Sequence, residues 1–184
     1  MPTDNRGPVI PRQADTSEEL DFSDPDSDDF DALSRDIIPV RSLVAEDLSH
    51  LVAIDRRITG ATRTAYFERK VTEALEQSAI RVSLIAEVDG LPVGFIMARV
   101  DFGEFGETAP EAVIDTLGVN PGIAHARVGV AMVSQLLTNL AALQVERVRT
   151  EVNWNQFDLL GFLEYCGFKP AQRLSFRRIA GAAG

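Results

Sequence analysis

Two features of this sequence are suited to chemistry: a carboxylate inside an apolar strand, and a turn that leads into a helix. Residues 112–119 alternate like a strand, and Asp115 is the one carboxylate among them. Apolar burial raises the pKa of a carboxyl group toward neutral pH, where it can accept a proton. We therefore expect Asp115 to be a general base, with Glu111 and Glu151 as alternatives.

The alternation along this segment also predicts which side chains share a face. Asp115 is expected on the same face as Val113, Leu117 and Val119, since successive strand residues point to opposite sides. A purely structural role remains open, in which the Asp115 side chain bonds to Thr116 or to a neighbouring loop.

The loop after this strand is suited to binding an anion. A proline and a glycine at positions 121–122 end the strand, and an amphipathic helix is expected over residues 128–143. Free amides and the positive dipole end make a helix N-terminus attractive to phosphate. His125 and Arg127 lie where a diphosphate would bind, and Gly129 lets the backbone approach a bound group. The same features also fit a plain strand-to-helix connection.

Hydrophobic periodicity predicts the elements that position these residues. A hairpin turn is expected at Asp89-Gly90, and residues 113–152 are expected to form a parallel strand-helix-strand unit. The expected fold is α/β (α+β), with a mixed, mostly antiparallel central sheet and helices on both faces. The expected strands are 38–43, 82–88, 93–100, 112–119, 145–152 and 174–179. The expected helices are 62–75, 128–143, 157–165 and a first one with apolar spacing over 45–54, which residues 58–60 are expected to break.

Charge is distributed unevenly along the 184 residues, whose formal net charge is -10 at pH 7. Residues 1–36 contain eleven acidic and three basic side chains. We expect a disordered acidic tail at residues 1–35, followed by one folded domain at 36–184, because the tail has too few apolar residues to form a core. The tail either aids solubility, attracts a basic partner or covers an active site.

Composition also argues against several classes of function. The folded part is nearly neutral and has no basic face, so nucleic-acid binding is not favoured. No apolar run reaches the roughly 18–20 residues that span a bilayer, and the first residues lack the apolar core of a signal peptide, so a cytoplasmic protein without membrane partners is expected. One cysteine and two histidines predict neither a disulfide nor a metal cofactor.

The chain from residue 38 to 179 resembles the GNAT superfamily of acyl-CoA N-acyltransferases. Val119-Asn120-Pro121, followed by a short loop and a helix, is similar to the family's V-x-P and cofactor loop. The family's loop motif reads R/Q-x-x-G-x-G/A. Aligned without gaps, only Gly129 matches it, whereas a shift of two residues places Ala126, Gly129 and Ala131 at the motif positions.

The resemblance implies that acetyl-CoA is the co-substrate. It implies that the strand backbone pairs with the pantetheine arm and polarises the thioester oxygen, and that the loop and helix bind the diphosphate. Asn155 matches an asparagine that contacts pantetheine in many members. The cofactor-binding residues implied in this way are Leu117, Gly118, Val119, His125, Arg127, Val128, Gly129, Val130, Ala131 and Asn155.

Two further positions matter to this resemblance. We expect Gly118 to mark a β-bulge that separates its strand from the one at 148–152 and opens a slot for the thioester. Leu163 stands where many members carry a tyrosine that protonates the leaving thiolate, and leucine cannot donate that proton.

The resemblance places the acceptor between the first two helices and a strand loop, at residues 56–67 and 102–107. The loop holds two phenylalanines and two glutamates, which suit a cation with an apolar stem. Arg56, Arg57 and Arg63 would instead suit a carboxylate. The sequence leaves a protein lysine, a protein N-terminus and a small amine open.

These observations predict an N-acetyltransferase that moves an acetyl group from acetyl-CoA to a primary amine by direct attack, helped by a carboxylate or a water-relayed base. The alternative favoured by the altered loop and Leu163 is an inactive GNAT-fold binding or regulatory module. A different nucleotide binder is disfavoured because no G-x-G-x-x-G is present. The apolar segment 174–179 either pairs across a homodimer or closes an edge of the sheet.

Overall fold

The computed structural model describes residues 37–78, 80–102, 109–123, 126–172 and 175. The predicted acidic tail, most of the 102–107 loop, His125 and all but one residue of the predicted final strand lie outside these residues. Within the described part, no helix has the length and apolar character needed to cross a membrane.

The elements follow the predicted order, with ends that differ by a few residues. The first predicted helix runs past the apolar spacing of residues 45–54 to Thr59 and ends at the expected break, where Gly60 adopts a left-handed φ of 73°. The elements are β1 (Val40–Ser42), the short turn η1 (Ala45–Asp47), α2 (Leu48–Thr59), α3 (Thr64–Thr72), the π-type turn η2 (Glu73–Gln77), β2 (Leu84–Val88), β3 (Leu91–Phe102), β4 (Pro110–Val119), α4 (Ala126–Ala142), β5 (Arg147–Thr150) and α5 (Phe157–Tyr165).

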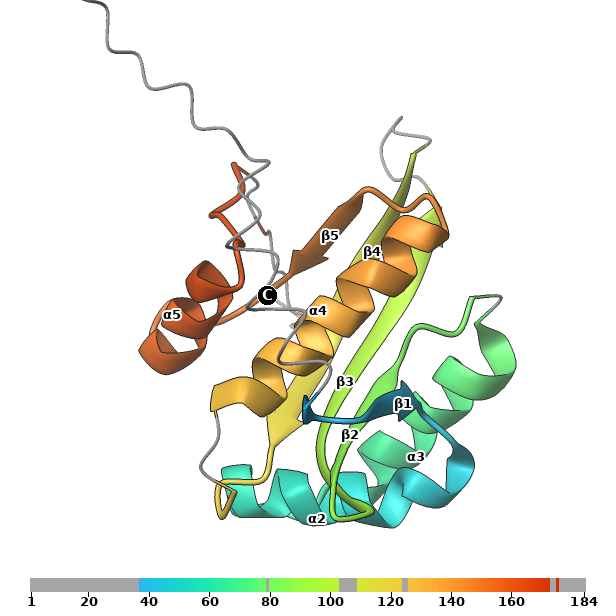
Figure 1. Cartoon of the computed structure of the whole chain (residues 1–184), viewed down its shortest axis with the longest axis vertical. Coiled ribbons are helices and arrows are strands. Elements are labelled where there is room, and N and C mark those ends of the chain that lie inside the picture. The colour runs from blue at the N-terminus through green and yellow to red at the C-terminus, as the bar shows by residue number, and fades with distance from the viewer. Residues whose placement is uncertain (1–36, 79, 103–108, 124–125, 173–174, 176–184) are drawn as a thin grey trace, which may run out of the picture.

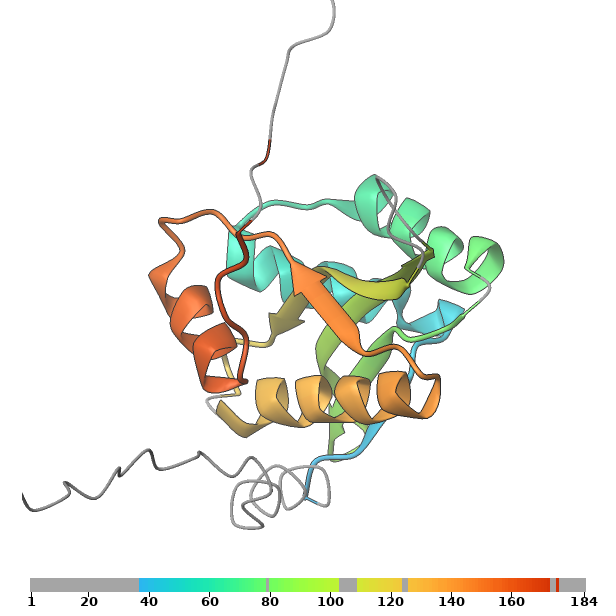
Figure 2. The same ribbon diagram turned by 90° about the horizontal axis from the view of Figure 1, so that it is seen from above.

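The five strands form one sheet in the order β1-β2-β3-β4-β5. The first three pairings are antiparallel, while β4 and β5, which α4 connects, are parallel. Helix α4 covers one face of the sheet, and α2 and α3 lie on the other (Figures 1 and 2). The mixed, mostly antiparallel sheet with helices on both faces is therefore confirmed.

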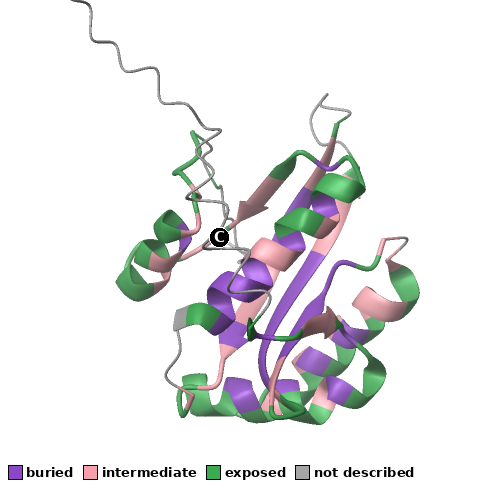
Figure 3. Cartoon of the chain, in the orientation of Figure 1, coloured by how far each residue is buried: buried purple, intermediate pink, exposed green. Residues whose placement is uncertain are grey.

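Two apolar clusters hold these layers together. On the α4 face, Val128, Met132 and Leu136 pack against strand residues such as Ile96. On the other face, α2 and α3 pack against β2 and β3, and the fully buried side chains there include Leu51, Phe67, Ile85 and Phe95. Figure 3 shows the buried residues along the inner sides of the helices and the middle of the sheet. Both sides of β3 are therefore covered, which makes this strand a rigid support.

The bulge in β4 lies at Asp115, so its prediction at Gly118 is wrong. Met97 of β3 pairs with Thr116 and the next residue of β3 pairs with Ile114, which leaves Asp115 as the extra residue. A glycine is required at position 118 because of close packing instead. A Cβ atom there would lie 2.9 Å from the ring of Phe95, so α2 and the core leave no room for a side chain.

The bulge also changes which side chains of β4 share a face. Leu117 and Val119 pack against the cluster under α4, whereas Asp115 points toward α3 and bonds to its Lys70. The predicted common face of Asp115, Leu117 and Val119 is therefore wrong, because the extra residue shifts the alternation by one.

Candidate functional site

Strands β4 and β5 pair along only part of β4. Residues 111–114 pair with residues 147–150, and β5 ends there while β4 continues to Val119. The Thr150 hydroxyl donates to the Ile114 carbonyl at 3.0 Å and secures the last pair. Among the described residues, no strand pairs with the remainder of β4 on the β5 side.

Backbone direction shows what this open stretch of β4 offers. The amide of Asn120 donates to the carbonyl of Val93 on β3 at 2.8 Å. Since the backbone groups of successive strand residues point to alternate sides, those of Leu117 and Val119 point toward the β5 side. Of the three predicted β4 contacts, Leu117 and Val119 offer hydrogen-bonding backbone groups along this edge, while Gly118 points its own toward β3.

The first turn of α4 lies just beyond the end of β4. Its backbone amides have no partners within the helix, and Arg127 is exposed there. The side chains of Val128, Val130 and Ala131 are buried, and the amides of the last two lie past the first turn, where the helix pairs them. The predicted phosphate contacts therefore reduce, within the described residues, to the first-turn amides and the Arg127 side chain.

Gly129 serves the contact between α4 and α5. A Cβ atom at Gly129 would lie 2.9 Å from Cε2 of Phe162, so the ring covers this side of the helix. Contact with this aromatic ring is therefore one reason for a glycine at this position, and the close approach of a bound group to the backbone of Gly129 stays a prediction.

The predicted C-terminal residues lie on and before α5. Asn155 is exposed in the turn after β5. Leu163 is buried, as expected for a core residue, whereas Tyr165 is 64% exposed. Leu163 has no proton to donate to a thiolate.

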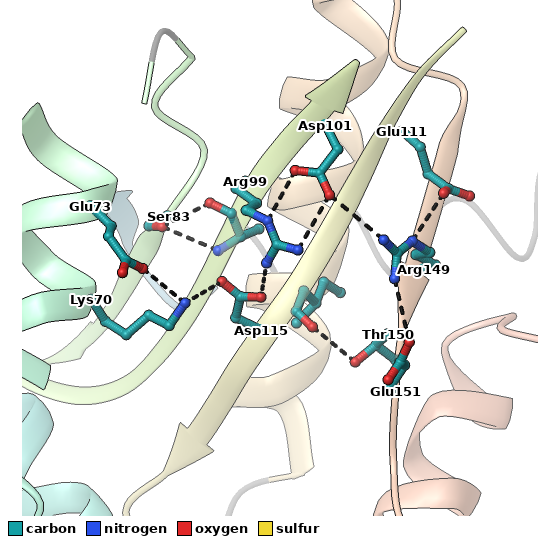
Figure 4. A network of polar contacts seen from close by, with 12 residues as sticks. Lys70, Glu73, Ser83, Arg99, Asp101, Glu111, Asp115, Arg149, Thr150 and Glu151 are labelled. Atoms are coloured by element: carbon teal, nitrogen blue, oxygen red, sulfur yellow. Dashed lines mark hydrogen bonds and ion pairs between the residues drawn. The ribbon is translucent and has the colours of Figure 1, made fainter. Parts of the chain in front are cut away.

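A chain of ion pairs surrounds Asp115 on the α3 side of the sheet (Figure 4). Lys70 Nζ of α3 lies 3.0 Å from Asp115 Oδ2 and 2.9 Å from Glu73 Oε2. Arg99 of β3 donates to the other oxygen of Asp115, and its Nε donates to Asp101 Oδ1 at 2.9 Å. Asp115 thus joins a helix to two strands through two cations.

The network continues across the sheet through Arg149 of β5. Its Nε donates to Glu111 Oε2 at 3.0 Å, and its other nitrogens lie 3.6 Å from Asp101 Oδ2 and from Glu151 Oε1. The three carboxylates expected as base or reserve, Asp115, Glu111 and Glu151, therefore lie in one network.

Burial and hydrogen bonding act in opposite directions on the two cations that hold Asp115. Desolvation lowers the pKa of Lys70, but its hydrogen bonds to Glu73 and Asp115 outweigh this effect and raise the pKa above its ordinary value. The pKa of Arg99 is raised in the same way, with desolvation opposed by its bonds to Asp115 and Asp101. Both side chains therefore stay positively charged across physiological pH.

A cavity of about 380 Å³ opens beside Asp115. Its wall combines the charged groups of Lys70, Glu73, Arg99 and Asp115 with apolar side chains of β3, including Met97. Asp115 follows Ile114, the last β4 residue paired with β5, so the cavity reaches the point where the two strands separate through this one residue, while the rest of its wall comes from α3, η2, β3 and the segment before β2. An apolar wall with a few converging charges suits a small ligand with an ionised group.

Arg63, predicted as a carboxylate-binding residue, binds a carboxylate of the chain itself. Its Nε donates to Asp55 Oδ2 at 2.8 Å, and a second nitrogen bonds the other oxygen. The guanidinium also lies 5.1 Å from the ring centroid of Tyr66. This pair fixes the corner between α2 and α3. Arg56 and Arg57 line a separate hollow on α2.

Sequence reasoning missed the cations of this site. Lys70 and Glu73 stand three residues apart on one helix, and Arg99 and Asp101 alternate on one strand, but such patterns also occur on ordinary surfaces. Only the approach of α3 to the bulge of β4 joins the two pairs. Among the described residues, no group of three or more His, Cys, Asp and Glu side chains is placed to hold a metal ion.

Comparison with protein families gives one match. The model described as the Acetyltransferase (GNAT) family matches residues 41–168, about two thirds of the chain. A search of curated protein sequences gives no significant match.

Several solved structures with a similar fold are named as acetyltransferases, and one is named as a transcriptional regulator from Bacillus halodurans C-125. An aminoglycoside N-acetyltransferase in complex with CoA aligns with a TM-score of 0.65 at 16% identity, over 77% of this chain and 94% of that one. A ribosomal-protein-alanine N-acetyltransferase from Brucella melitensis biovar Abortus 2308 aligns with a TM-score of 0.63 at 17% identity, over 78% and 99%. An aminoglycoside antibiotic 6'-N-acetyltransferase from Acinetobacter baumannii aligns with a TM-score of 0.65 at 12% identity, over 78% and 98%. At such identities the likeness shows the fold.

Proposed function

The chain belongs to the GNAT acetyltransferase family, and on that premise we propose that it is an N-acetyltransferase that moves an acetyl group from acetyl-CoA to a primary amine. One observation carries the proposal. Asp115 lines the cavity and directly follows the last β4 residue paired with β5, so a donor along β4 and an acceptor in the cavity would meet at this one carboxylate.

The residues on the donor side fit an acyl-CoA. The open edge of β4 at Leu117 and Val119 supports amide pairing with a pantetheine arm, and one of its N–H groups would polarise the thioester oxygen. The first-turn amides of α4 and the Arg127 guanidinium would hold the diphosphate. Acetyl-CoA would supply the acetyl group as a thioester.

We assign Asp115 to the acceptor amine. Its carboxylate would bind the ammonium form and then take a proton, directly or through water, so that the amine nitrogen can bond to the acetyl carbon while the C–S bond breaks. The nitrogen would lose its second proton as the intermediate collapses to the amide, and CoA would take up that proton through water and leave as the thiol, since Leu163 has no proton to give. Glu111 accepts a hydrogen bond from Arg149, so its carboxylate would hold Arg149 in the ion-pair network rather than bind the amine.

The acceptor is proposed only as a primary amine. The structurally similar enzymes include some named for aminoglycosides and one named for a ribosomal-protein alanine. A cavity of about 380 Å³ with apolar walls supports a small amine or a single side chain, since it is too small for a folded partner.

Calorimetric titration with acetyl-CoA tests the donor side, and thiol release with a panel of primary amines tests turnover. We expect micromolar binding and amine-dependent release. Asp115→Asn should keep acetyl-CoA affinity within about twofold and lower kcat by roughly 100-fold or more. Glu68→Gln, which alters an exposed carboxylate on the same helix as Lys70, is the matched control.

Each outcome has a clear meaning. No binding at millimolar acetyl-CoA refutes the proposal. Binding without turnover on any amine favours the inactive binding module instead. An unchanged rate for Asp115→Asn removes this carboxylate from the reaction.

A further inference from the structure

Lys70 places an ammonium group where an acceptor amine would meet Asp115. Its Nζ lies 3.0 Å from Asp115 Oδ2 and 2.9 Å from Glu73 Oε2, inside the wall of the cavity. An alkylammonium ligand has the same charge, the same donors and a similar apolar stem. The cavity therefore already contains, from the chain itself, the chemical group that the proposed reaction requires from outside.

We propose that Lys70 is an internal competitor for the ammonium subsite at Asp115, and that the acceptor amine must displace it from this carboxylate. This inference rests on the proposed function and adds a residue that sets acceptor affinity.

The arrangement of the two carboxylates allows such a displacement. Glu73 stands three residues after Lys70 on the same helical segment. The ion pair between Lys70 and Glu73 can therefore remain when Lys70 leaves Asp115. Asp115 belongs to the sheet and stays in place. The Lys70 side chain is 20% exposed and that of Glu73 40%, so the lysine has space to turn toward solvent.

Arg99, the other cation on Asp115, is held too firmly for this role. Its guanidinium donates to both oxygens of Asp101, at 2.9 and 3.2 Å, while a third contact reaches Asp115. Two bonds to a neighbour on the same strand keep Arg99 in position when the cavity fills. Lys70 has a single flexible contact with Asp115 and is the weaker partner.

The charge of Lys70 decides whether it competes or reacts. Its pKa is raised, because the bonds to Glu73 and Asp115 outweigh desolvation, so Lys70 keeps its positive charge at neutral pH. Lys70 therefore acts as a cation that occupies the subsite. With Lys70 in place, the positive charges of Lys70 and Arg99 neutralise the negative charges of Glu73 and Asp115 in the cavity wall. Removal of the Lys70 charge leaves one negative charge in excess, which favours a cationic ligand.

Lys70→Met tests the proposal because it keeps the apolar stem and removes the charge. We expect the KM for a primary amine to fall about tenfold, the order expected for removal of one charged hydrogen bond, with the effect in KM rather than in kcat. Arg69→Met is the matched control, since it removes a charge from the same helix, and Arg69 contacts Glu73 only at 3.9 Å. Its KM should stay within about twofold of the wild type.

A second measurement is independent of turnover. n-Butylamine titrated into the full-length protein, followed by NMR or calorimetry, should bind Lys70→Met about tenfold more tightly than the wild type. Acetyl-CoA affinity of each variant, measured in parallel, reports on the fold and on the proposed function separately.

Three results would overturn the inference while leaving acetyl-CoA binding intact. They are an unchanged KM and butylamine affinity in Lys70→Met, a weaker affinity in that variant, or a mass spectrum showing acetylated Lys70 after incubation with acetyl-CoA. The last would make Lys70 a substrate.

Discussion

Replacement of Arg63 by methionine should destabilise the protein and leave acceptor binding unchanged. Arg63 holds the buried carboxylate of Asp55 with two hydrogen bonds and lies over the rings of Tyr66 and Phe67. The side chain of Asp55 is 4% exposed, while that of Arg63 is 42% exposed. The variant therefore leaves a negative charge without its counter-ion inside the corner between α2 and α3.

The magnitude follows from this asymmetry in burial. Removal of one partner of a fully buried ion pair costs roughly 3–5 kcal/mol. Water reaches the exposed side of Arg63, so about 2–3 kcal/mol is the better expectation, and loss of the cation–π contact adds roughly 0.5 kcal/mol. The double variant Asp55→Asn, Arg63→Met should lose less than the sum of its single variants by about 1 kcal/mol or more, since a neutral amide needs no counter-ion.

Urea unfolding at pH 7 measures these free energies, and the acceptor KM is measured in parallel. Arg57→Met, on the exposed surface of α2, is the control and should stay within about 0.5 kcal/mol of the wild type. A loss below about 0.5 kcal/mol for Arg63→Met would refute the reasoning. A higher acceptor KM at unchanged stability would return Arg63 to the role of binding a ligand carboxylate.

Three other predictions concern pH, the diphosphate and the contact between helices. Burial opposes the ionisation of Asp47, but bonds from Arg41 and a backbone amide outweigh it and lower the pKa of Asp47. The ionised Asp47 therefore stabilises the fold above the unfolded-state pKa of about 3.9, and this stabilisation is lost as pH falls through the folded-state pKa. Urea unfolding of Asp47→Asn should show a lower free energy of unfolding at pH 7 and a smaller decrease in that free energy as the pH is lowered. Arg127→Glu should raise the calorimetric Kd for acetyl-CoA about tenfold with stability unchanged, and an unaltered Kd would remove the start of α4 from the donor site. Gly129→Ala should destabilise by about 1 kcal/mol, because contact with Phe162 outweighs the better helix propensity of alanine, and a rise in melting temperature would show that the ring moves aside freely.

Local pattern was enough to predict most of the fold. The apolar period of α5 predicted its bounds, Phe157–Tyr165, and Asp89-Gly90 predicted the turn between β2 and β3, where both residues have positive φ. These features depend on neighbours within a few residues, whose spacing can be read directly. The break expected at residues 58–60 matches the end of α2 at Thr59, where Gly60 with a left-handed φ stops the helix.

Some features of the candidate site could likewise be predicted from local sequence, and others could not. Sequence by itself determined that Asp115 is a carboxylate within a strand and that this strand leads through a proline turn into a helix. Tertiary structure alone decided that Asp115 is a bulge residue, that its partners are Lys70 and Arg99, and that Gly129 faces Phe162. The bulge depends on how β3 and β4 register, and the ion pairs depend on where α3 comes to lie. Both follow from packing among residues far apart in the chain, which local periodicity does not record.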